Sequence, residues 1–205
     1  MSIFEKLYET GVVPVATFSD CGFAVSASEA LQEGGLSCVE ITFRTPEAEK
    51  CVNAVAKNVG ITVGAGTILT VEQAKRAVGA GASFIVSPGT NAAVVEYCLK
   101  ENVFVIPGVM TPSEVTLGVN LGLSLLKFFP AGQAGGLNMI KALSAPFPDL
   151  KFMPSGGITI ENVPEYLAFS KVPVVGGSFM MKKTPGEIKE ASVLTALAVK
   201  KARGL

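Results

Sequence analysis

Short, wholly apolar runs alternate along this chain with longer stretches in which apolar residues recur at helical spacing. We find eight apolar runs, at 12–18, 38–43, 61–66, 83–87, 103–108, 124–129, 150–155 and 172–178. Their hydrophobicity is continuous rather than alternating, which is typical of strands buried on both faces of a parallel sheet. The pattern therefore predicts eight parallel strands.

The stretches between these runs carry signals for the start of a helix. A capping side chain, followed in two cases by proline at the first helical position, is typical of a helix N-terminus. Ser19 and Asp20 precede 21–33, Thr45-Pro46 opens 46–58, Thr70 opens 71–79, and Thr111-Pro112 opens 113–121.

Eight strand-then-helix units in one chain predict an α/β protein, a closed (β/α)8 barrel of the short TIM type, as a single domain over 1–205. An open doubly wound sheet is the alternative, but it normally has a glycine-rich loop after the first strand. This chain has SDCGFAV there, which lacks that pattern. The first dozen residues are expected to form an extra helix packed against one end of the barrel.

Charge and hydropathy limit the classes of partner. The chain carries 17 basic and 17 acidic residues, which gives no electrostatic case for nucleic acid or an acidic membrane surface. No apolar stretch approaches the roughly 18 residues needed to cross a bilayer. Glu5 and Glu9 lie where a signal peptide needs an apolar core. We therefore expect a cytoplasmic protein without a nucleic-acid or membrane partner.

The residue types present also limit the chemistry. The chain has no histidine, which removes the commonest zinc ligand and any histidine general base. The four cysteines show no C-x-x-C spacing, so we expect reduced thiols that are mostly packed in the interior. Catalysis would then depend on carboxylates, lysines, hydroxyls and backbone groups.

Lys127 lies inside the apolar run LSLLKFF. In one interpretation its ammonium is paired with a carboxylate and is purely structural. In the other, the apolar surroundings disfavour the charged form, and the neutral amine attacks a carbonyl substrate to form a Schiff base. We expect Phe128 and Phe129 to supply the low dielectric and a wall for the substrate.

The run CVEITFRT places Glu40 and Thr42 on one face of a strand, with Arg44 at its end. A buried carboxylate is costly without a partner, and Lys127 is the obvious one. The two residues form either a structural ion pair or a catalytic pair in which Glu40 transfers protons. Arg44 has a planar fork suited to a carboxylate, although on sequence alone it is equally an ordinary surface arginine.

Other strand ends place small and hydroxyl residues at the mouth of the barrel, where active sites of this fold lie. GAGT places Thr67 there and SPGT places Pro88 there, although both motifs also suit ordinary turns. PSGGIT and VGGS follow the last two strands, where barrels commonly bind phosphate through backbone N–H groups. The candidates for that anion site are Ser155, Gly156, Gly157, Gly177 and Ser178.

VEITFRT, GAGT, SPGT, KFFPA, SGGI and GGS occur in the order and spacing of the class I 2-keto-3-deoxy-6-phosphogluconate (KDPG) aldolases. The chain resembles this family from about Gly11 to Lys182. The family is often bifunctional with 4-hydroxy-2-oxoglutarate (KHG). The resemblance implies cleavage of KDPG to pyruvate and glyceraldehyde 3-phosphate, or of KHG to pyruvate and glyoxylate. It also implies a homotrimer without metal or organic cofactor.

The resemblance implies a role for each matched residue. Lys127 is the Schiff-base lysine, and Glu40 is the general acid and base, working with a water. Arg44, Thr67 and the Pro88 region hold the pyruvyl carboxylate. Phe129 lines the pocket, and the phosphate or distal end of the substrate meets Ser155, Gly156, Gly157, Gly177 and Ser178.

The chain departs from the family at two positions. Many relatives have arginine near the end of the first strand, where this chain has Thr17, and many have threonine in place of Ser155. Both positions lie close to the distal substrate groups, so the pyruvate half is the better supported. Three other hypotheses remain: a same-mechanism aldolase for KHG or 2-keto-3-deoxy-6-phosphogalactonate, a phosphosugar isomerase on the same barrel, and a non-catalytic phosphometabolite-binding barrel.

Overall fold

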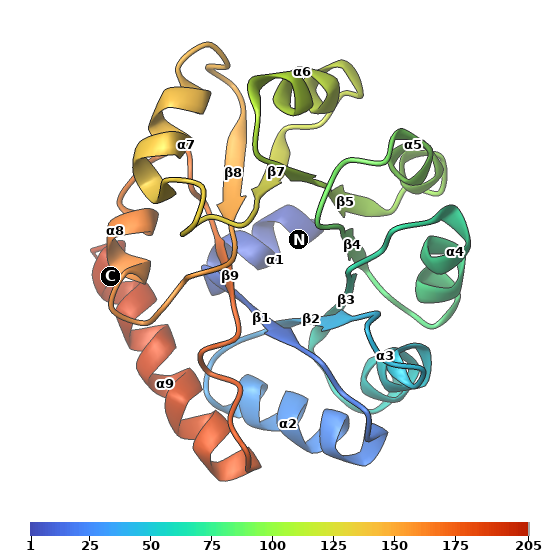
Figure 1. The fold of residues 1–205 in the computed structure, drawn as a ribbon. Helices are drawn as coiled ribbons and strands as arrows, with labels where there is room; N and C mark the ends of the chain where they lie inside the picture. Colours follow the sequence, from blue (N-terminus) through green and yellow to red (C-terminus); the bar gives the residue numbers. More distant parts are fainter. Residues whose placement is uncertain (205) are drawn as a thin grey trace.

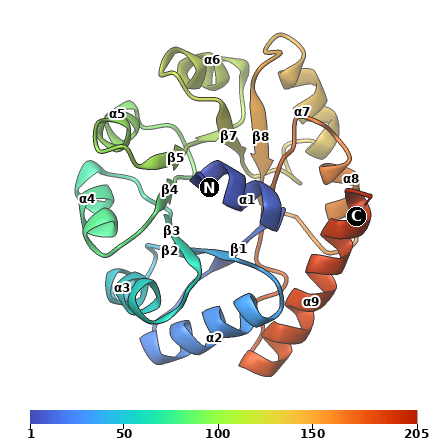
Figure 2. The same cartoon turned by 180° about the vertical axis from the view of Figure 1, so that it is seen from behind.

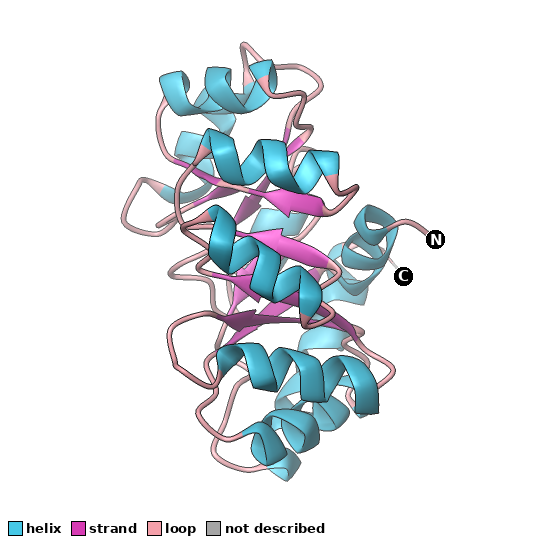
Figure 3. Cartoon of the chain, turned by 90° about the vertical axis from the view of Figure 1, so that its right-hand side faces the viewer, coloured by secondary structure: helices cyan, strands magenta, loops and turns pink. Residues whose placement is uncertain are grey.

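The computed structural model describes residues 1–204, and its strands form a parallel barrel surrounded by helices (Figure 1). Strands and helices alternate along the chain, and the view from the side shows the strands inside the layer of helices (Figure 3). The strands are β1 (Val12–Ala16), β2 (Cys38–Thr42), β3 (Thr62–Gly66), β4 (Phe84–Val86), β5 (Phe104–Ile106), β6 (Gly108–Val109), β7 (Leu125–Phe128), β8 (Lys151–Pro154) and β9 (Val175–Gly177).

The helices that cover the strands follow them in sequence order around the barrel (Figure 1). They are α2 (Cys21–Glu33), α3 (Ala48–Asn58), α4 (Val71–Gly79), α5 (Ala92–Lys100), α6 (Pro112–Asn120), α7 (Gly136–Ser144), α8 (Val163–Leu167) and α9 (Pro185–Ala202). The predicted (β/α)8 barrel is therefore confirmed.

Strand pairing takes the sheet around the barrel in two parts. One sheet has the order β5-β4-β3-β2-β1-β9, and the other has the order β6-β7-β8. A bridge between Ser155 and Gly176 joins β8 to β9. On the other side, β5 and β6 are two halves of the predicted fifth strand, which is interrupted at Pro107, because proline has no N–H to donate to the sheet.

The predicted extra helix is α1 (Ile3–Thr10), which lies across the end of the barrel opposite the site described below (Figure 2). Its Leu7 packs with Val13, Phe84 and Leu125 inside the barrel. Ser2 and Glu5 form a capping box that fixes where this helix begins. The helix therefore closes one end of the barrel and leaves the other open.

The predicted helix starts are correct except for one. Asp20, Thr70 and Thr111 each accept hydrogen bonds from backbone N–H groups of the first turn of α2, α4 and α6. Thr45 does not cap a helix: its hydroxyl donates to the carbonyl of Phe18, and α3 begins only at Ala48. This bond ties the loop after β2 to the loop after β1.

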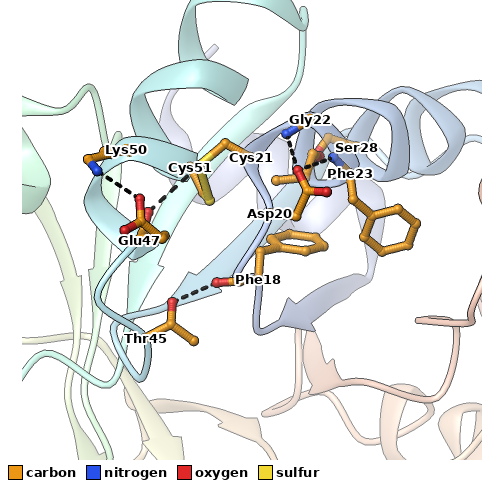
Figure 4. Close-up of a disulfide and its surroundings, with 11 residues drawn as sticks. Phe18, Asp20, Cys21, Gly22, Phe23, Ser28, Thr45, Glu47, Lys50 and Cys51 are labelled. Carbon is orange, nitrogen blue, oxygen red and sulfur yellow. Dashed lines mark hydrogen bonds and ion pairs between the residues drawn. A yellow bond between two sulfur atoms is a disulfide. The ribbon is translucent and has the colours of Figure 1, made fainter.

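The expectation of reduced thiols is wrong for two of the four cysteines. Cys21, the first residue of α2, forms a disulfide with Cys51 in α3, with 4.5 Å between their Cα atoms (Figure 4). Cys38 and Cys98 are free and buried, as expected. Burial raises the pKa of the Cys38 thiol to about 12 and that of Cys98 to about 11.

No helix in residues 1–204 has the length and apolarity that a membrane span requires.

Candidate active site

Every residue that the sequence nominated for the site, except Phe128, lines one cavity of about 210 Å³. These residues lie at or just beyond the carboxyl ends of strands, at the end of the barrel that α1 leaves open. The lining consists of Val15, Glu40, Thr42, Arg44, Thr67, Pro88, Lys127, Phe129, Ser155, Gly156, Gly157, Ile158, Gly177 and Ser178.

Strand alternation places Glu40 and Lys127 inside the barrel. Residues two apart on a strand share a face, so Glu40 follows Cys38 on β2 and Lys127 follows Leu125 on β7. Cys38 and Leu125 belong to the apolar cluster that fills the barrel above α1. The two ionisable side chains therefore form the next layer toward the open end.

Glu40 and Lys127 make a close but incomplete ion pair. Lys127 Nζ lies 3.6 Å from Glu40 Oε1, and the side chains are only 8% and 1% exposed. This separation is longer than a good hydrogen bond, and Glu40 Oε2 is buried without a hydrogen-bond partner in the described residues. A purely structural pair would satisfy both oxygens, so the unpartnered Oε2 distinguishes this arrangement from a fully formed structural ion pair.

Gly66 makes room for the carboxylate of Glu40. A Cβ at Gly66 would collide with Glu40 Oε1 and would lie 2.6 Å from Glu40 Cδ. Gly66 pairs with Thr42 in the β2–β3 register, so its backbone lies directly beside the Glu40 side chain. The second glycine of the GAGT motif is therefore required by the position of Glu40.

Only one of the two phenylalanines next to Lys127 reaches the cavity. Lys127 Nζ lies 5.4 Å from the centroid of the Phe129 ring, which lines the cavity. Phe128 is wholly buried in the cluster between the strands and the helices. The expectation that both rings form the substrate wall is wrong for Phe128, because adjacent residues on a strand face opposite sides.

Arg44 is held at the rim by two hydroxyl groups. Its Nε donates to Thr42 Oγ1 at 3.2 Å, and its Nη2 donates to Thr17 Oγ1 at 2.8 Å. These contacts use one edge of the guanidinium and leave the Nη1 side for a ligand. The arginine is thus built into the wall of the cavity and is not a free surface side chain.

Thr67 has a left-handed backbone conformation, with φ 59°, which is uncommon for a β-branched residue. Backbone hydrogen bonds hold both sides of it: Phe43 N donates to Gly66 O, and Ile68 N donates to Val86 O. Strain of this kind is found at ligand-binding positions that the surrounding structure enforces.

Pro88 approaches the cavity because Gly108 lies against it. A Cβ at Gly108 would collide with the carbonyl of Pro88. The hydroxyl of Thr90 donates to Gly108 O at 2.9 Å and so fastens the same loop to the next strand. The loop after β4 is therefore fixed at the cavity by backbone packing.

The loop after β8 presents a row of backbone N–H groups. The carbonyls of Ser155 and Gly156 accept from Ala131 N and Gly132 N, at 2.8 Å each. The carbonyl of Gly157 accepts from the side-chain amide of Asn162. In a trans peptide the next N–H points opposite to the carbonyl, so the N–H groups of residues 156–158 point away from these partners, and all three residues line the cavity. Residues 156–158 are therefore the candidates for binding an anion through backbone N–H groups.

The sequence missed three of the lining residues: Val15, Thr42 and Ile158. Val15 could have been found from its register, because it pairs with Glu40 across β1 and β2. Thr42 shares a strand face with Glu40, and that shared face is the signal that points to it. No sequence signal distinguishes Ile158 from any residue after a glycine pair.

A larger cavity of about 430 Å³ lies at the opposite end of the barrel, between α1 and the amino ends of the strands. Its lining, which includes Phe4, Leu99, Asn102 and Leu123, contains no ionisable side chain. Of these two cavities, only the smaller has an amine, a carboxylate and a guanidinium in its lining, and the candidate backbone N–H groups of the loop after β8 lie beside them. This set suits a substrate with a carbonyl, a carboxylate and a distal anion.

Comparisons with known proteins agree with this geometry. The family model for KDPG and KHG aldolase matches residues 3–197. A 2-dehydro-3-deoxy-phosphogluconate aldolase from Treponema pallidum (strain Nichols) is 41% identical, over 97% of this chain and 95% of its own. The KHG/KDPG aldolase of Escherichia coli K12 is 37% identical, over 95% and 92%.

A solved structure shows a covalent intermediate on the same fold. It is the KDPG aldolase from Legionella pneumophila, with pyruvate captured at low pH as a covalent carbinolamine. That protein is 36% identical to this chain and superposes with a TM-score of 0.87, over 97% of each chain.

Proposed function

The chain belongs to the KDPG and KHG aldolase family, and from that premise we propose that it cleaves KDPG to pyruvate and glyceraldehyde 3-phosphate through a Schiff base on Lys127. The observation that carries the proposal is the buried pair of Lys127 and Glu40 at the open end of the barrel. KHG, which would give pyruvate and glyoxylate, is the proposed second substrate. One barrel domain performs the whole reaction.

The reaction begins at Lys127. Its neutral Nζ attacks the C2 ketone, the carbonyl oxygen leaves as water, and a cationic iminium forms. Glu40 Oε1 lies 3.6 Å from Nζ, and we propose that it exchanges protons with the amine and the carbinolamine through one bridging water. The attack requires the neutral amine, so Lys127 must first give up a proton, and Glu40 is the neighbouring carboxylate proposed to take it.

The carbon–carbon bond breaks once the iminium is in place. Glu40 takes the proton of the C4 hydroxyl, the C3–C4 electron pair moves toward the iminium nitrogen, and the aldehyde departs. The resulting enamine takes a proton back at C3, and water releases pyruvate from Lys127. Glu40 Oε2, which has no hydrogen-bond partner in residues 1–204, is the oxygen proposed to carry this proton.

The two ends of the substrate meet different parts of the cavity. We assign the pyruvyl carboxylate to Arg44, with Thr67 and Pro88 beside it. The distal phosphate is assigned to the N–H groups of the loop after β8, together with Ser155, Gly177 and Ser178. The Phe129 ring covers the reacting carbons, and the mechanism uses no metal or organic cofactor.

The active protein is proposed to be a cytoplasmic homotrimer. The support for the trimer is the family resemblance. Light scattering in solution tests it. The disulfide between Cys21 and Cys51 is unusual for a reducing compartment, and the thiol count described below bears on the location.

Cleavage kinetics with purified protein test the function. We expect cleavage of KDPG, measured as pyruvate release, to fall at least about a thousandfold in Lys127→Ala, which retains the binding groups but not the nucleophile. Near wild-type cleavage by this variant would refute the mechanism. Comparing KDPG, KHG and 2-keto-3-deoxy-6-phosphogalactonate identifies the preferred aldehyde. Isomerase activity or ligand binding without turnover would favour the other two hypotheses.

A further inference from the structure

Thr17, Thr42 and Arg44 form a hydrogen-bonded group at the rim of the cavity, and the mechanism above assigns a role only to Arg44. We propose that Thr17 is a positioning residue for carboxylate binding, because it fixes the guanidinium of Arg44 in the orientation that leaves its outer fork free for the substrate. Thr17 does not line the cavity. The inference rests on the proposed function, in which Arg44 binds the carboxylate of the 2-keto acid.

Three contacts define the group. Arg44 Nη2 donates to Thr17 Oγ1 at 2.8 Å, Arg44 Nε donates to Thr42 Oγ1 at 3.2 Å, and the two threonine hydroxyl oxygens lie 2.7 Å apart. Nε and Nη2 form one edge of the planar guanidinium, so the two hydroxyls bind this edge side by side. The other edge, formed by Nη1 and the second hydrogen of Nη2, is the fork that matches a carboxylate.

The donor and acceptor roles of the two threonine hydroxyls follow from these contacts. Each hydroxyl accepts one N–H from Arg44, and only one of the two hydroxyl protons can lie between the oxygens. Thr42 is buried, whereas Thr17 is exposed at the rim. No buried proton is left unpaired if Thr42 donates to Thr17 and Thr17 donates to solvent. Thr17 is then the common acceptor for Arg44 and Thr42.

The two threonines are fixed by the sheet, whereas Arg44 is not. Thr17 directly follows β1, whose Val15 and Ala16 pair with β2, and Thr42 is the last residue of β2. Arg44 lies in the turn beyond β2, and its long side chain reaches back to them from there. Without a second hydroxyl, its guanidinium would keep a single anchor at Thr42 and would sample other rotamers.

Thr17→Val removes the hydroxyl and keeps the shape of the side chain. The probe is pyruvate, and the readout is its half-saturating concentration for inactivation by borohydride. We expect this concentration to rise about three- to tenfold, the effect of losing one hydrogen bond at a partly solvated site. The inactivation rate at saturating pyruvate, and the inhibition constant of inorganic phosphate against cleavage, should not change. Thr17→Ser should restore the wild-type value.

Two controls separate positioning from other effects. In an Arg44→Ala background, Thr17→Val should have no further effect, because Thr17 acts only through the missing guanidinium. Thr10→Val makes the same chemical change at the opposite end of the barrel, where Thr10 Oγ1 lies 2.6 Å from Ser37 Oγ. Its half-saturating pyruvate concentration should equal that of the wild type.

Specific results would overturn the inference. An unchanged half-saturating pyruvate concentration in Thr17→Val would exclude it, and so would an equal loss in the Arg44→Ala background. A matching change in the phosphate inhibition constant would indicate general disturbance of the site. These failures differ from failure of the proposed function, in which the wild-type protein itself would form no adduct with pyruvate.

Discussion

Replacing Lys127 by methionine would leave the carboxylate of Glu40 buried without a counter-charge. Glu40 is 1% exposed, its Oε2 already has no hydrogen-bond partner in residues 1–204, and Lys127 Nζ is the cation that lies 3.6 Å from Oε1. Methionine keeps the apolar stem of the lysine, so the change removes the charge with little loss of packing. The variant therefore isolates the cost of an unpaired buried charge.

Breaking a buried ion pair by removing one partner typically costs about 3–5 kcal/mol. The wild-type pair is long at 3.6 Å, which places the expected loss near the lower end, at about 3 kcal/mol. In a chain of this length that loss corresponds to a fall in Tm of about 6–12 °C. Adding Glu40→Leu removes the stranded charge, and the double variant should return to within about 1 kcal/mol of the wild type or exceed it.

Urea unfolding followed by far-UV circular dichroism, at one fixed protein concentration, measures these differences. Lys50→Met is the control, because it breaks an exposed ion pair, 2.9 Å to Glu47, in which the lysine is 74% exposed. The loss from breaking this exposed pair should stay below about 1 kcal/mol. The reasoning fails if Lys127→Met costs less than about 1 kcal/mol, or if Glu40→Leu adds to the loss and does not relieve it.

Three further predictions concern the glycine beside Glu40 and the cysteines. Gly66→Ala should lower kcat at least about tenfold with the fold retained, because its Cβ would displace the Glu40 carboxylate; unchanged pyruvate release would contradict this. Denatured, unreduced protein should react with Ellman's reagent at two thiols, and at four after reduction of the Cys21–Cys51 bond; four without reductant would contradict the disulfide. Burial raises the pKa of Cys38 from 9.0 to about 12, so the stability it contributes is complete below pH 9 and is lost as the pH rises toward 12. Between pH 9 and 11, unfolding free energy should fall more steeply in the wild type than in Cys38→Ala, by up to about 1.4 kcal/mol per pH unit; equal slopes would contradict this.

The barrel is predictable from the sequence because its signals are local and repeated. Continuous apolar runs identify the strands, and Asp20, Thr70 and Thr111 mark where helices begin. Alternation along β2 and β7 is enough to place Glu40 and Lys127 on inward faces. Side chains that meet across the barrel can be anticipated because the fold brings all the carboxyl strand ends together.

The features that sequence reasoning misses depend on spatial neighbours that the sequence does not reveal. Cys21 and Cys51 are 30 residues apart on different helices, and no spacing motif links them. The error on Phe128 is different, because alternation along β7 would have placed its ring on the face opposite to Lys127. The hydrogen bonds of Arg44 to Thr17 and Thr42 could be predicted only by knowing how far β1 and β2 are shifted along each other, which their register sets.

Trapping with borohydride in the presence of pyruvate, followed by peptide mass mapping, tests the central claim most directly. If the protein is a Schiff-base aldolase, the reduced pyruvyl adduct lies on the peptide that contains Lys127, and activity is lost in proportion to its formation. No adduct on folded protein with pyruvate in excess, or an adduct on another lysine, would contradict the assignment. In that case the Lys127–Glu40 pair would be structural.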